Sequence, residues 1–495
     1  MIRLGPDVAR LDANARWALD LLVDFAALVP VDAPDANVVE ADVPRPDAPD
    51  SWPRAATVAQ ARGAGWGITE AGPGRVLIDP AALALVAHIA TARDEQESTA
   101  SDRHERVPSS VNALVRQGCE REPVLHEAAQ TLREAVCRVA ERRPVRFLAP
   151  WPDGRRWAAA VTHDLDVVAG WPAFAGLRWA ELVQGGHFRL AVQTAAAAVR
   201  SALGDPVLCA VQDVLAAEDA HGVRSTWFVL CGTPTVHTVR AGDLTYRAES
   251  PAARRILARV AAGGHEIGLH GSFATSLDVG RFAAERTRLA RVADTPVDGV
   301  RQHFLRMRPG HTQRCMTEAG FRYDATFGFP DRNGFRLGAA DVVPAAPAMN
   351  DGGLPPLDLV PLVWMDRALS KYRGVENPDA WIDDAVALAT ACREVSGLWT
   401  GLWHPNLAPA LGYPGAPAAF TRLLTELAAA EPYMAPLGEV VRWRAARRAV
   451  RLAALAPDTR SAHAVTPGDP RLVVEEVDGT RDVALSAVVR RSGAF

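Results

Sequence analysis

The chain has 495 residues, with 54 basic and 58 acidic side chains and a formal net charge of -4, so no global positive field attracts nucleic acid or anionic lipid. Hydrophobic residues make up 48% of it and charged residues 23%, which is a globular composition and excludes wholesale disorder. At roughly 150 residues per domain, the length predicts two or three folded units. Lysine occurs once, at Lys371, and we draw no function from this bias towards arginine.

Cysteine usage and hydropathy indicate the compartment. Six cysteines lie far apart without a Cys-x-x-Cys pair, which predicts reduced, structural thiols and argues against a disulfide framework, a zinc ribbon or a redox dithiol. The apolar stretch 21–30 lacks the basic flank and the small-residue cleavage site of a signal peptide. No apolar run reaches the roughly 18 residues that a membrane span needs. We therefore expect a soluble, cytoplasmic protein.

Residues 1–150 are expected to form a smaller α/β domain of unknown role. Apolar helical periodicity covers 11–29, 81–92 and 124–142. Between the first two, the stretch from Pro30 to Pro53 carries six prolines and six acidic residues, which predicts a loop or linker. The sequence Trp-Pro-Asp-Gly at 151–154 predicts a turn, and the pattern changes after it. We therefore place a domain boundary near residue 150.

From 151 to about 450, short apolar runs alternate with helical patterns. The helical patterns include 208–220, 251–263, 280–292 and 380–395, and the runs cover 157–164, 225–231, 266–270, 299–303, 357–365 and 398–404. Strands separated by helices predict a parallel sheet, because parallel strands need a crossover connection. Six or more such strands favour a barrel over an open sheet. Residues 451–495 are expected to form a tail that begins as a helix and continues as a strand-like segment, 471–491.

Several common catalytic motifs are missing from the sequence. Neither a G-x-G-x-x-G fingerprint nor a P-loop opens any helix, which argues against dinucleotide and nucleoside triphosphate binding. The pair His265-Glu266 is followed by a histidine five residues after the first, not four, so a helical zinc-protease motif cannot form. No serine has glycine two residues before and two residues after it, which excludes a serine-hydrolase elbow.

The polar ends of the apolar runs are the strongest functional feature. In a βα barrel, function lies at the carboxyl ends of the strands. Four of the runs end in polar side chains of catalytic type, namely Asp164 with Asp166, His270, Arg301 with His303, and His404. The period-two alternation of a strand places His270 on the face opposite Ile267 and Leu269, and it groups Arg301 with His303 and Thr162 with Asp164. These side chains are expected to converge inside the barrel mouth.

Asp, His and His at one mouth are typical ligands of a catalytic divalent ion that keeps one position open for water. A single histidine at a strand end is more often structural, and an aspartate there often caps a helix. Because several such residues occur together at the strand ends of one sequence, we favour the catalytic interpretation for them. We interpret the nearby His265 as structural. Trp403 and Trp364 are interpreted either as an apolar pocket wall or as core, and Asp366 either as a pocket residue or as a turn residue.

These motifs resemble those of the polysaccharide deacetylase family, also known as carbohydrate esterase family 4 or the chitooligosaccharide deacetylase homology domain. Residues 162–166 resemble its aspartate-rich first motif, 264–270 (GHEIGLH) its second, 301–306 (RQHFLR) its arginine motif, and 402–404 its final Leu-x-His motif. The stretch 323–336, which contains Asp324 and Asp331, is similar to a divergent bacterial branch with an extra N-terminal domain. The resemblance covers about 155–445.

The resemblance implies a distorted (β/α)7 barrel and one divalent metal, Zn²⁺ in the first instance, with Mn²⁺, Co²⁺ or Ni²⁺ as alternatives. It implies Asp164 as general base, Asp166 and His270 as metal ligands, Arg301 as the partner of the base and His404 as general acid. Because Leu165 separates the two carboxylates, their roles remain interchangeable. The second metal histidine of the family corresponds to Ala274 here. We expect His303 to replace it as a metal ligand, and His163 is the second candidate for that role.

We therefore predict a hydrolase that removes an acetyl group from an acetylated sugar or glycoconjugate, and no nucleic-acid partner. Asp324, Asp331, Asp366, His163 and Trp403 are further candidate site residues. Two alternatives remain open. One keeps the barrel but cleaves another amide or a ureide. The other is an inactive, metal-free relative that binds sugar or acts as a scaffold.

Overall fold

The computed structural model describes residues 2–29, 39–43, 57–140, 144–168, 171–201, 204–233, 235–236, 243, 246–349, 355–455, 474–478 and 489–491. Within these ranges, none of the helices combines the length and the apolar character that crossing a bilayer requires. All six cysteines are free, and five of them are buried, as the sequence predicts for structural thiols.

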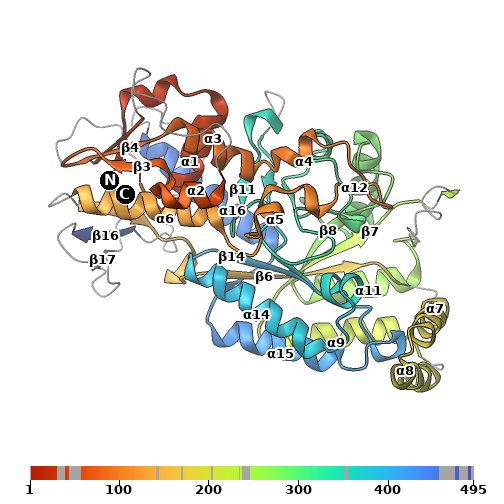
Figure 1. The fold of residues 1–495 in the computed structure, drawn as a ribbon. Coiled ribbons are helices and arrows are strands. Elements are labelled where there is room, and N and C mark those ends of the chain that lie inside the picture. Colours follow the sequence, from red (N-terminus) through yellow and green to blue (C-terminus); the bar gives the residue numbers. More distant parts are fainter. Residues whose placement is uncertain are drawn as a thin grey trace.

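A small α/β unit lies at the N-terminal end of the chain (Figure 1). Its sheet has the strand order β1-β2-β4-β3, from β1 (Ile2–Leu4), β2 (Val39–Asp42), β3 (Ile68–Glu70) and β4 (Arg75–Ile78). Its longer helices are α1 (Ala13–Phe25), α3 (Pro80–Ala90) and α6 (Val124–Ala140), and α2 (Val58–Gly63) is a shorter one. The side chain of Asp12 accepts hydrogen bonds from the backbone N–H groups of Asn14 and Ala15, which fixes the start of α1. This second sheet confirms the additional α/β unit.

The interpretation of the stretch from Pro30 to Pro53 as a loop is wrong at its centre, because β2 lies within it. β2 pairs in parallel with β1 on one side and with β4 on the other, and Ala41 and Asp42 are buried. A four-residue strand between prolines shows no periodicity long enough to recognise, and its pairing partners are distant in sequence. The rest of that stretch lies outside the described residues.

Residues 158–402 form the expected barrel. The strands are β6 (Ala158–Leu165), β7 (Thr226–Leu230), β8 (Glu266–Gly271), β9 (Gly299–Gln302), β10 (Tyr323–Asp324), β12 (Asp358–Leu359), β13 (Trp364–Met365) and β14 (Leu398–Leu402). They pair in parallel in the order β12-β10-β9-β8-β7-β6-β14-β13. Two short additions are β11 (Val343–Pro344), antiparallel to β12, and β15 (Tyr433–Met434), parallel to β6.

The segment that contains β12 and β13 closes the ring. Its first half pairs with β10, and beyond β12 the N–H of Val360 donates to Asp324 O at 2.8 Å. Its second half turns to the other side, where the N–H of Val363 donates to Thr400 O at 3.1 Å and β13 pairs with β14. One irregular strand therefore joins the two edges of the sheet. This arrangement confirms the (β/α)7 barrel, in which β12 and β13 share one strand position.

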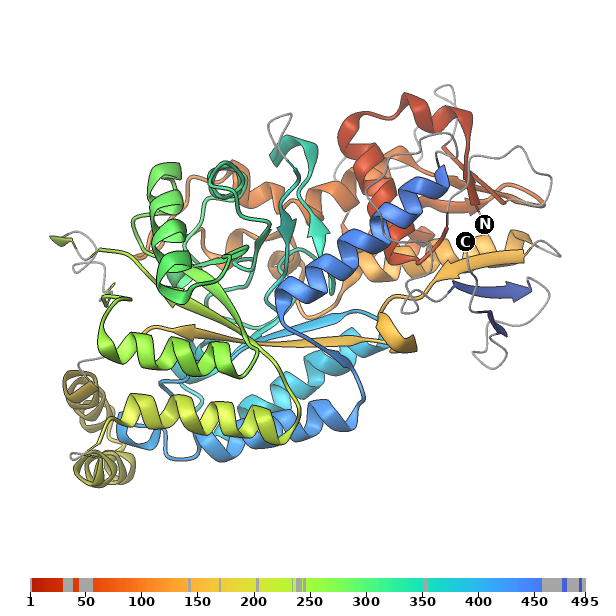
Figure 2. The same ribbon diagram turned by 180° about the vertical axis from the view of Figure 1, so that it is seen from behind.

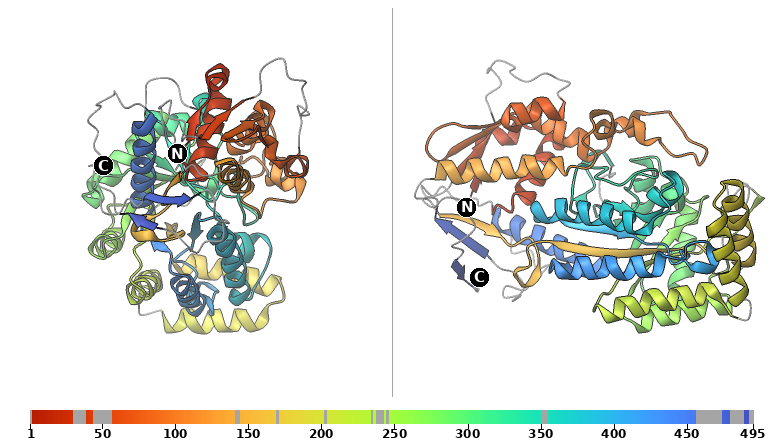
Figure 3. Two further views of the ribbon diagram at one scale, coloured as in Figure 1. Left: turned by 90° about the vertical axis from the view of Figure 1, so that its left-hand side faces the viewer. Right: turned by 60° about the horizontal axis from the view of Figure 1, so that its bottom comes forward.

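Helices surround the barrel (Figures 1 and 2). They are α7 (Trp171–Gln184), α8 (Phe188–Arg200), α9 (Pro206–Ala220), α11 (Pro251–Ala262), α12 (Val279–Ala293), α13 (His311–Glu318), α14 (Pro378–Glu394) and α15 (Ala416–Ala429). α7 and α8, drawn in olive, lie at the end of the molecule opposite the two chain ends (Figure 3). Ile267 and Leu269 of β8 pack in the same core as Ile256, Leu257 and Phe282 of these helices, so the other face of β8 points into the barrel.

The amino end of the barrel is filled by α16 (Leu437–Leu455). Leu437 and Val440 of α16 pack with Ala160, Phe228 and Leu398 from the barrel strands. Figure 2 shows α16 running from the barrel towards the N-terminal unit. There Arg444 forms buried ion pairs with Asp341 at 2.8 Å and with Asp24 of α1 at 3.4 Å. Apolar side chains therefore close one end of the barrel, and only the opposite end is available for a site.

Part of the predicted tail belongs to a third sheet. β16 (Val474–Asp478) lies between β5 (Pro144–Leu148) and β17 (Val489–Arg491), and both pairings are antiparallel. The predicted helix near residue 450 is the second half of α16. The remainder of the predicted strand-like segment lies outside the described residues.

Residues 93–117 of the N-terminal unit cross to the barrel and lie at the carboxyl ends of its strands. They include α4 (Arg93–Glu97) and α5 (Ala113–Gln117). Nη1 of Arg106 donates to Phe304 O at 3.0 Å, and Nη1 of Arg308 donates to Ala100 O at 3.1 Å. Glu95 forms a fully buried ion pair with Arg336, with Nε to Oε2 at 3.1 Å, and it also accepts a hydrogen bond from Asn112 at 2.7 Å.

We expect Glu95→Ala to be strongly destabilising. It leaves the Arg336 guanidinium buried without its carboxylate, a change that costs about 3–5 kcal/mol in comparable sites. Urea unfolding followed by circular dichroism measures the loss. Arg93→Ala is the matched control, because Arg93 pairs with Glu97 at the surface and such pairs contribute about 0–1 kcal/mol. Equal losses for both variants would contradict the prediction.

Candidate metal centre

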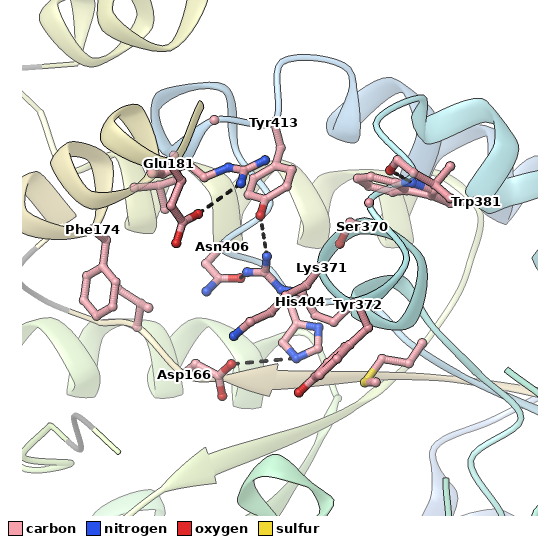
Figure 4. A pocket seen from close by; sticks show the side chains of 18 of the residues that line it. Asp166, Phe174, Glu181, Ser370, Lys371, Tyr372, Trp381, His404, Asn406 and Tyr413 are labelled. Carbon is pink, nitrogen blue, oxygen red and sulfur yellow. Dashed lines mark hydrogen bonds and ion pairs between the residues drawn. The ribbon is translucent and has the colours of Figure 1, made fainter. Parts of the chain in front are cut away.

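The carboxyl ends of the barrel strands open into a cavity of about 710 Å³. This size is typical of small-molecule sites. Its lining includes residues from four strand ends that were grouped from the sequence, namely Asp164, Asp166, His270, His303 and His404. Figure 4 shows Asp166 and His404 among the side chains of the cavity. The sequence prediction that these side chains converge on one mouth therefore agrees with their positions.

Asp166, His270 and His303 form the tightest polar cluster in the cavity. Their potential ligand atoms all lie within 4.8 Å of one another. Oδ1 of Asp166 is 3.4 Å from Nε2 of His270 and 3.8 Å from Nε2 of His303. Asp166 follows β6, His270 lies in β8 and His303 follows β9, so three different strand ends supply the cluster, two of them on adjacent strands.

The hydrogen bonds of the two imidazoles fix which nitrogen faces Asp166. Nδ1 of His270 lies 2.9 Å from Arg301 O, and Nδ1 of His303 lies 3.1 Å from Oδ1 of Asp243. Because both partners accept only, each Nδ1 carries a proton, and Nε2 is the nitrogen that faces Asp166 and that a neutral ring would offer to a metal ion. Histidine ligands of metal ions are oriented in this way by carbonyl or carboxylate partners.

The position of His303 depends on an unusual backbone turn. Residues 303–305 form a 3-10 turn after β9, and Phe304 has a φ of 60°, which is uncommon for a residue with a side chain. The Phe304 ring stacks on the His303 imidazole at 3.9 Å. The turn and the ring together hold the imidazole over the cavity.

Asp166 has the properties expected of a metal ligand. Its Oδ1 is buried and accepts no hydrogen bond from the described residues. Burial opposes ionisation, but the neighbouring His270, His303 and His404 outweigh it and lower the pKa of this carboxyl group. Burial also opposes a charge on His270, whereas Asp164 and Asp166 raise its pKa overall. A carboxylate oxygen and two imidazole lone pairs around one point fit a divalent cation.

A second pair, Asp164 and Arg301, lies beside this cluster. Nη1 of Arg301 donates to Oδ1 of Asp164 and to Oγ1 of Thr162, both at 2.9 Å, and Nε donates to Ala325 O at 3.0 Å. The guanidinium also lies 4.4 Å above the Phe228 ring. Oδ2 of Asp164 is 3.6 Å from Nε2 of His270. One carboxylate oxygen is thus held by arginine while the other faces the cluster.

His404 and Asp366 form a third pair. Nδ1 of His404 lies 2.7 Å from Oδ1 of Asp366, whose Oδ2 accepts the backbone N–H of His404 at 2.6 Å. Asp366 is fully buried, so its carboxylate fixes both the ring and the backbone of His404. Nε2 of His404 then faces Oδ2 of Asp166 at 3.7 Å. Asp366 therefore contributes by orienting a histidine and not as a turn residue.

His163 does not reach the cavity, so its role as the second candidate ligand is wrong. Its Nδ1 lies 2.8 Å from Trp403 O and its Nε2 lies 2.9 Å from Oε1 of Glu218, and both partners are on the outside of β6. The alternation of β6 explains this position, because His163 lies between Thr162 and Asp164 and points the opposite way.

Trp403 and Trp364 belong to the core and not to the cavity wall. Trp403 packs 5.1 Å from Phe420 and stacks 6.4 Å from Trp364. The pocket-wall interpretation is therefore wrong for both, and Trp381 is the tryptophan that lines the cavity.

Asp324 and Asp331 also lie away from the cavity lining. Asp324 is fully buried and accepts hydrogen bonds from Gln313 Nε2 at 2.9 Å and from Thr326 N at 2.8 Å. Asp331 accepts from Oγ of Ser109 in the N-terminal unit at 2.5 Å. Both support loops of the barrel edge.

Sequence reasoning missed Asp243. It is fully buried, accepts the N–H of Phe273 at 2.6 Å through Oδ2, and orients His303 through Oδ1. It lies between β7 and α11 in a segment without periodicity or a motif, so no pattern in the sequence singles it out. Sequence reasoning also missed the cationic residues of the cavity lining, such as Arg103 and Arg367, because arginine is abundant throughout the chain.

No family model matches the sequence, and no curated protein matches it significantly. Solved structures do match. A Mycobacterium smegmatis protein described as a polysaccharide deacetylase is 24% identical, with 60% of this chain and 93% of that chain covered and a TM-score of 0.40. The chitin deacetylase of the fungal pathogen Colletotrichum lindemuthianum is 12% identical, with 59% and 89% covered and a TM-score of 0.32. A CE4 family pseudoenzyme from Bacillus anthracis is 9% identical, with 57% and 65% covered and a TM-score of 0.31.

Proposed function

We propose that this protein is a metal-dependent hydrolase that removes an acetyl group from an N-acetylated or O-acetylated sugar. The observation that carries the proposal is the cluster of Asp166, His270 and His303, whose ligand atoms lie within 4.8 Å of one another beside an Asp–Arg pair and an Asp–His pair. The acetylated substrate comes from the resemblance of the strand-end motifs to those of polysaccharide deacetylases. The cavity of about 710 Å³ suits a small substrate.

Asp166, His270 and His303 would hold the divalent ion, with Asp243 and the carbonyl of Arg301 orienting the two imidazoles. Such an ion supplies a Lewis acid that polarises an acyl carbonyl and makes a water molecule more acidic. This assignment gives His303 the role that the family assigns to the histidine replaced by Ala274.

Asp164 would act as the general base. Arg301 holds its Oδ1, which leaves Oδ2 directed towards the cluster. In hydrolysis, the water oxygen bonds to the acyl carbon while Asp164 accepts a water proton. His404 then gives a proton to the sugar nitrogen or oxygen as its bond to the acyl carbon breaks, and Asp366 stabilises the protonated imidazole. The products are acetate and the free amine or alcohol.

We expect the purified protein to contain about one equivalent of a divalent metal, as in sites of this ligand type. It should release acetate from some members of a panel of N-acetylated and O-acetylated sugars. A chelator should abolish release, and added Zn²⁺, Mn²⁺, Co²⁺ or Ni²⁺ should restore it. Elemental analysis and an acetate assay measure both results.

Two outcomes would overturn this proposal. A protein without bound metal, whose properties are unchanged by chelators, would be a sugar-binding or scaffold protein. A metal-containing protein that releases no acetate but cleaves another amide or a ureide would be a hydrolase of a different substrate class.

A further inference from the structure

Cationic side chains line the cavity from segments outside the barrel strands. Arg103 and Arg106 come from the N-terminal unit, Arg178 from α7, and Arg367 and Lys371 from the segment after β13. The chain as a whole has a net charge of -4, so this concentration of positive charge is local.

Three of these cations have no carboxylate partner among the described residues. Arg178 pairs with Glu181 at 3.1 Å and Arg106 pairs with Asp102 at 2.7 Å. For Arg103, Arg367 and Lys371, in contrast, no described carboxylate lies within 4.0 Å. Within the part of the chain that the structure describes, Arg367 donates only to neutral acceptors, the hydroxyl of Tyr413 at 2.6 Å and Oδ1 of Asn406 at 3.0 Å.

The acidic residues of the cavity have ion-pair partners of their own, and Asp166 acts on Arg367 and Lys371 only through space. Glu376 pairs with His187 at 2.6 Å, and Glu181 with Arg178. Asp164 is held by Arg301, and Asp166 faces the histidine cluster. Arg367 is half-buried, whereas Arg103 and Lys371 are exposed, so all three side chains are free to bind an anion that enters the cavity.

Lys371 is distinctive in both sequence and structure. It is the single lysine among 54 basic residues, and it lies in a π-helical turn, Ala368–Tyr372, a rare conformation that often marks functional sites. Figure 4 shows it in the same cavity as Asp166 and His404. Burial and the charges of Arg367 and Arg103 lower the pKa of Lys371, and the charges of Asp166 and Glu181 offset this only in part.

We propose that the substrate carries an anionic group, a phosphate or a carboxylate, that Lys371, Arg367 and Arg103 bind while the acyl group lies at Asp166. This inference rests on the proposed function and narrows its substrate class to acidic acetylated sugars. Arginine and lysine cations bind both kinds of anion through charge-assisted hydrogen bonds. Arg103 would give the N-terminal unit a direct part in substrate binding.

The single lysine allows a test that needs no catalysis. An amine-specific reagent can modify only Lys371 and the N-terminal amine, and the latter serves as an internal reference. Mass spectrometry follows the rate of modification at each amine in the metal-loaded protein. N-acetylglucosamine 6-phosphate and N-acetylmuramic acid are the anionic probes, and N-acetylglucosamine is the neutral control.

At least one anionic probe should slow modification of Lys371 about tenfold at a concentration at which the neutral sugar has little effect, as one charge-assisted contact implies. The rate at the N-terminal amine should not change. Equal protection by neutral and anionic sugars, or no protection by either anionic probe, would overturn the inference. Protection without acetate release from any sugar would keep the anion site and reject the deacetylase.

The affinities of variants for the same sugars provide a second test of the inference. Lys371→Gln should weaken binding of the protective anionic sugar about tenfold, measured by calorimetry, and leave the affinity for the neutral sugar unchanged. Arg322→Gln is the matched control, because Arg322 is an exposed cation outside the cavity lining. If Lys371→Gln weakens both sugars equally, Lys371 has only a structural role.

Discussion

Replacing His303 by alanine should strip the protein of its divalent metal and abolish acetate release. The change removes one of three ligands and leaves the side chains of Asp166 and His270 in place. Loss of a residue that only orients a ligand costs about 10–100-fold in metal affinity, so loss of the ligand itself should cost more. Elemental analysis after gel filtration and metal titration of the apoprotein measure the effect.

Two variants make this prediction specific to the ligand. Asp243→Asn changes the residue that orients His303 but keeps the imidazole, so metal affinity should fall within the range of about 10–100-fold. His221→Ala is the matched control, because His221 bonds to Ala217 O and Thr425 outside the cavity. Unchanged metal content in His303→Ala would remove His303 from the ligand set and leave the role of the second family histidine unfilled.

The alternation of apolar and polar residues in strands accounts for most of what could be predicted about the site. It directs His270 and Arg301 into the barrel. The same rule turns His163 outward, so this second candidate ligand could have been rejected from the sequence alone. His303 lies beyond the end of β9, where alternation no longer applies, and the left-handed Phe304 sets its direction.

The fold was predictable where strands are long and not where they are short. The runs at β6, β7, β8 and β14 have at least five residues, and the sequence reveals them. β10 has two residues and no detectable pattern. The run 357–365 was predicted as one strand, but its halves pair with β10 and with β14, which are far apart in sequence.

The contribution of the N-terminal unit to the cavity was not predictable. Arg103 and Arg106 lie in a charged segment whose composition indicates only solvent exposure. Arg106 is nevertheless buried, because Asp102, Tyr372 and the carbonyl of Phe304 satisfy its guanidinium. These partners lie up to 266 positions away in the chain, and only the assembled structure brings them together.

Replacing His404 by alanine should separate proton donation from metal binding. We expect metal content to be unchanged, because Asp166, His270 and His303 remain, while kcat on an acetylated amino sugar falls by about 10²–10⁴-fold. Asp366→Asn should show the same pattern with a smaller loss, since the imidazole stays but loses its carboxylate partner. Acetate release and elemental analysis on the same preparations measure both effects.

Substrates with different leaving groups test whether His404 acts as a general acid. An amine must be protonated as it leaves, whereas a nitrophenolate leaves without a proton, so His404→Ala should lose less than about tenfold on nitrophenyl acetate. Asp164→Asn, which removes the base, should lose activity on both substrates, because each needs an activated water. If His404→Ala loses the same factor on both substrates, His404 does not protonate the leaving group, and its place beside Asp166 would indicate a role in holding that carboxylate.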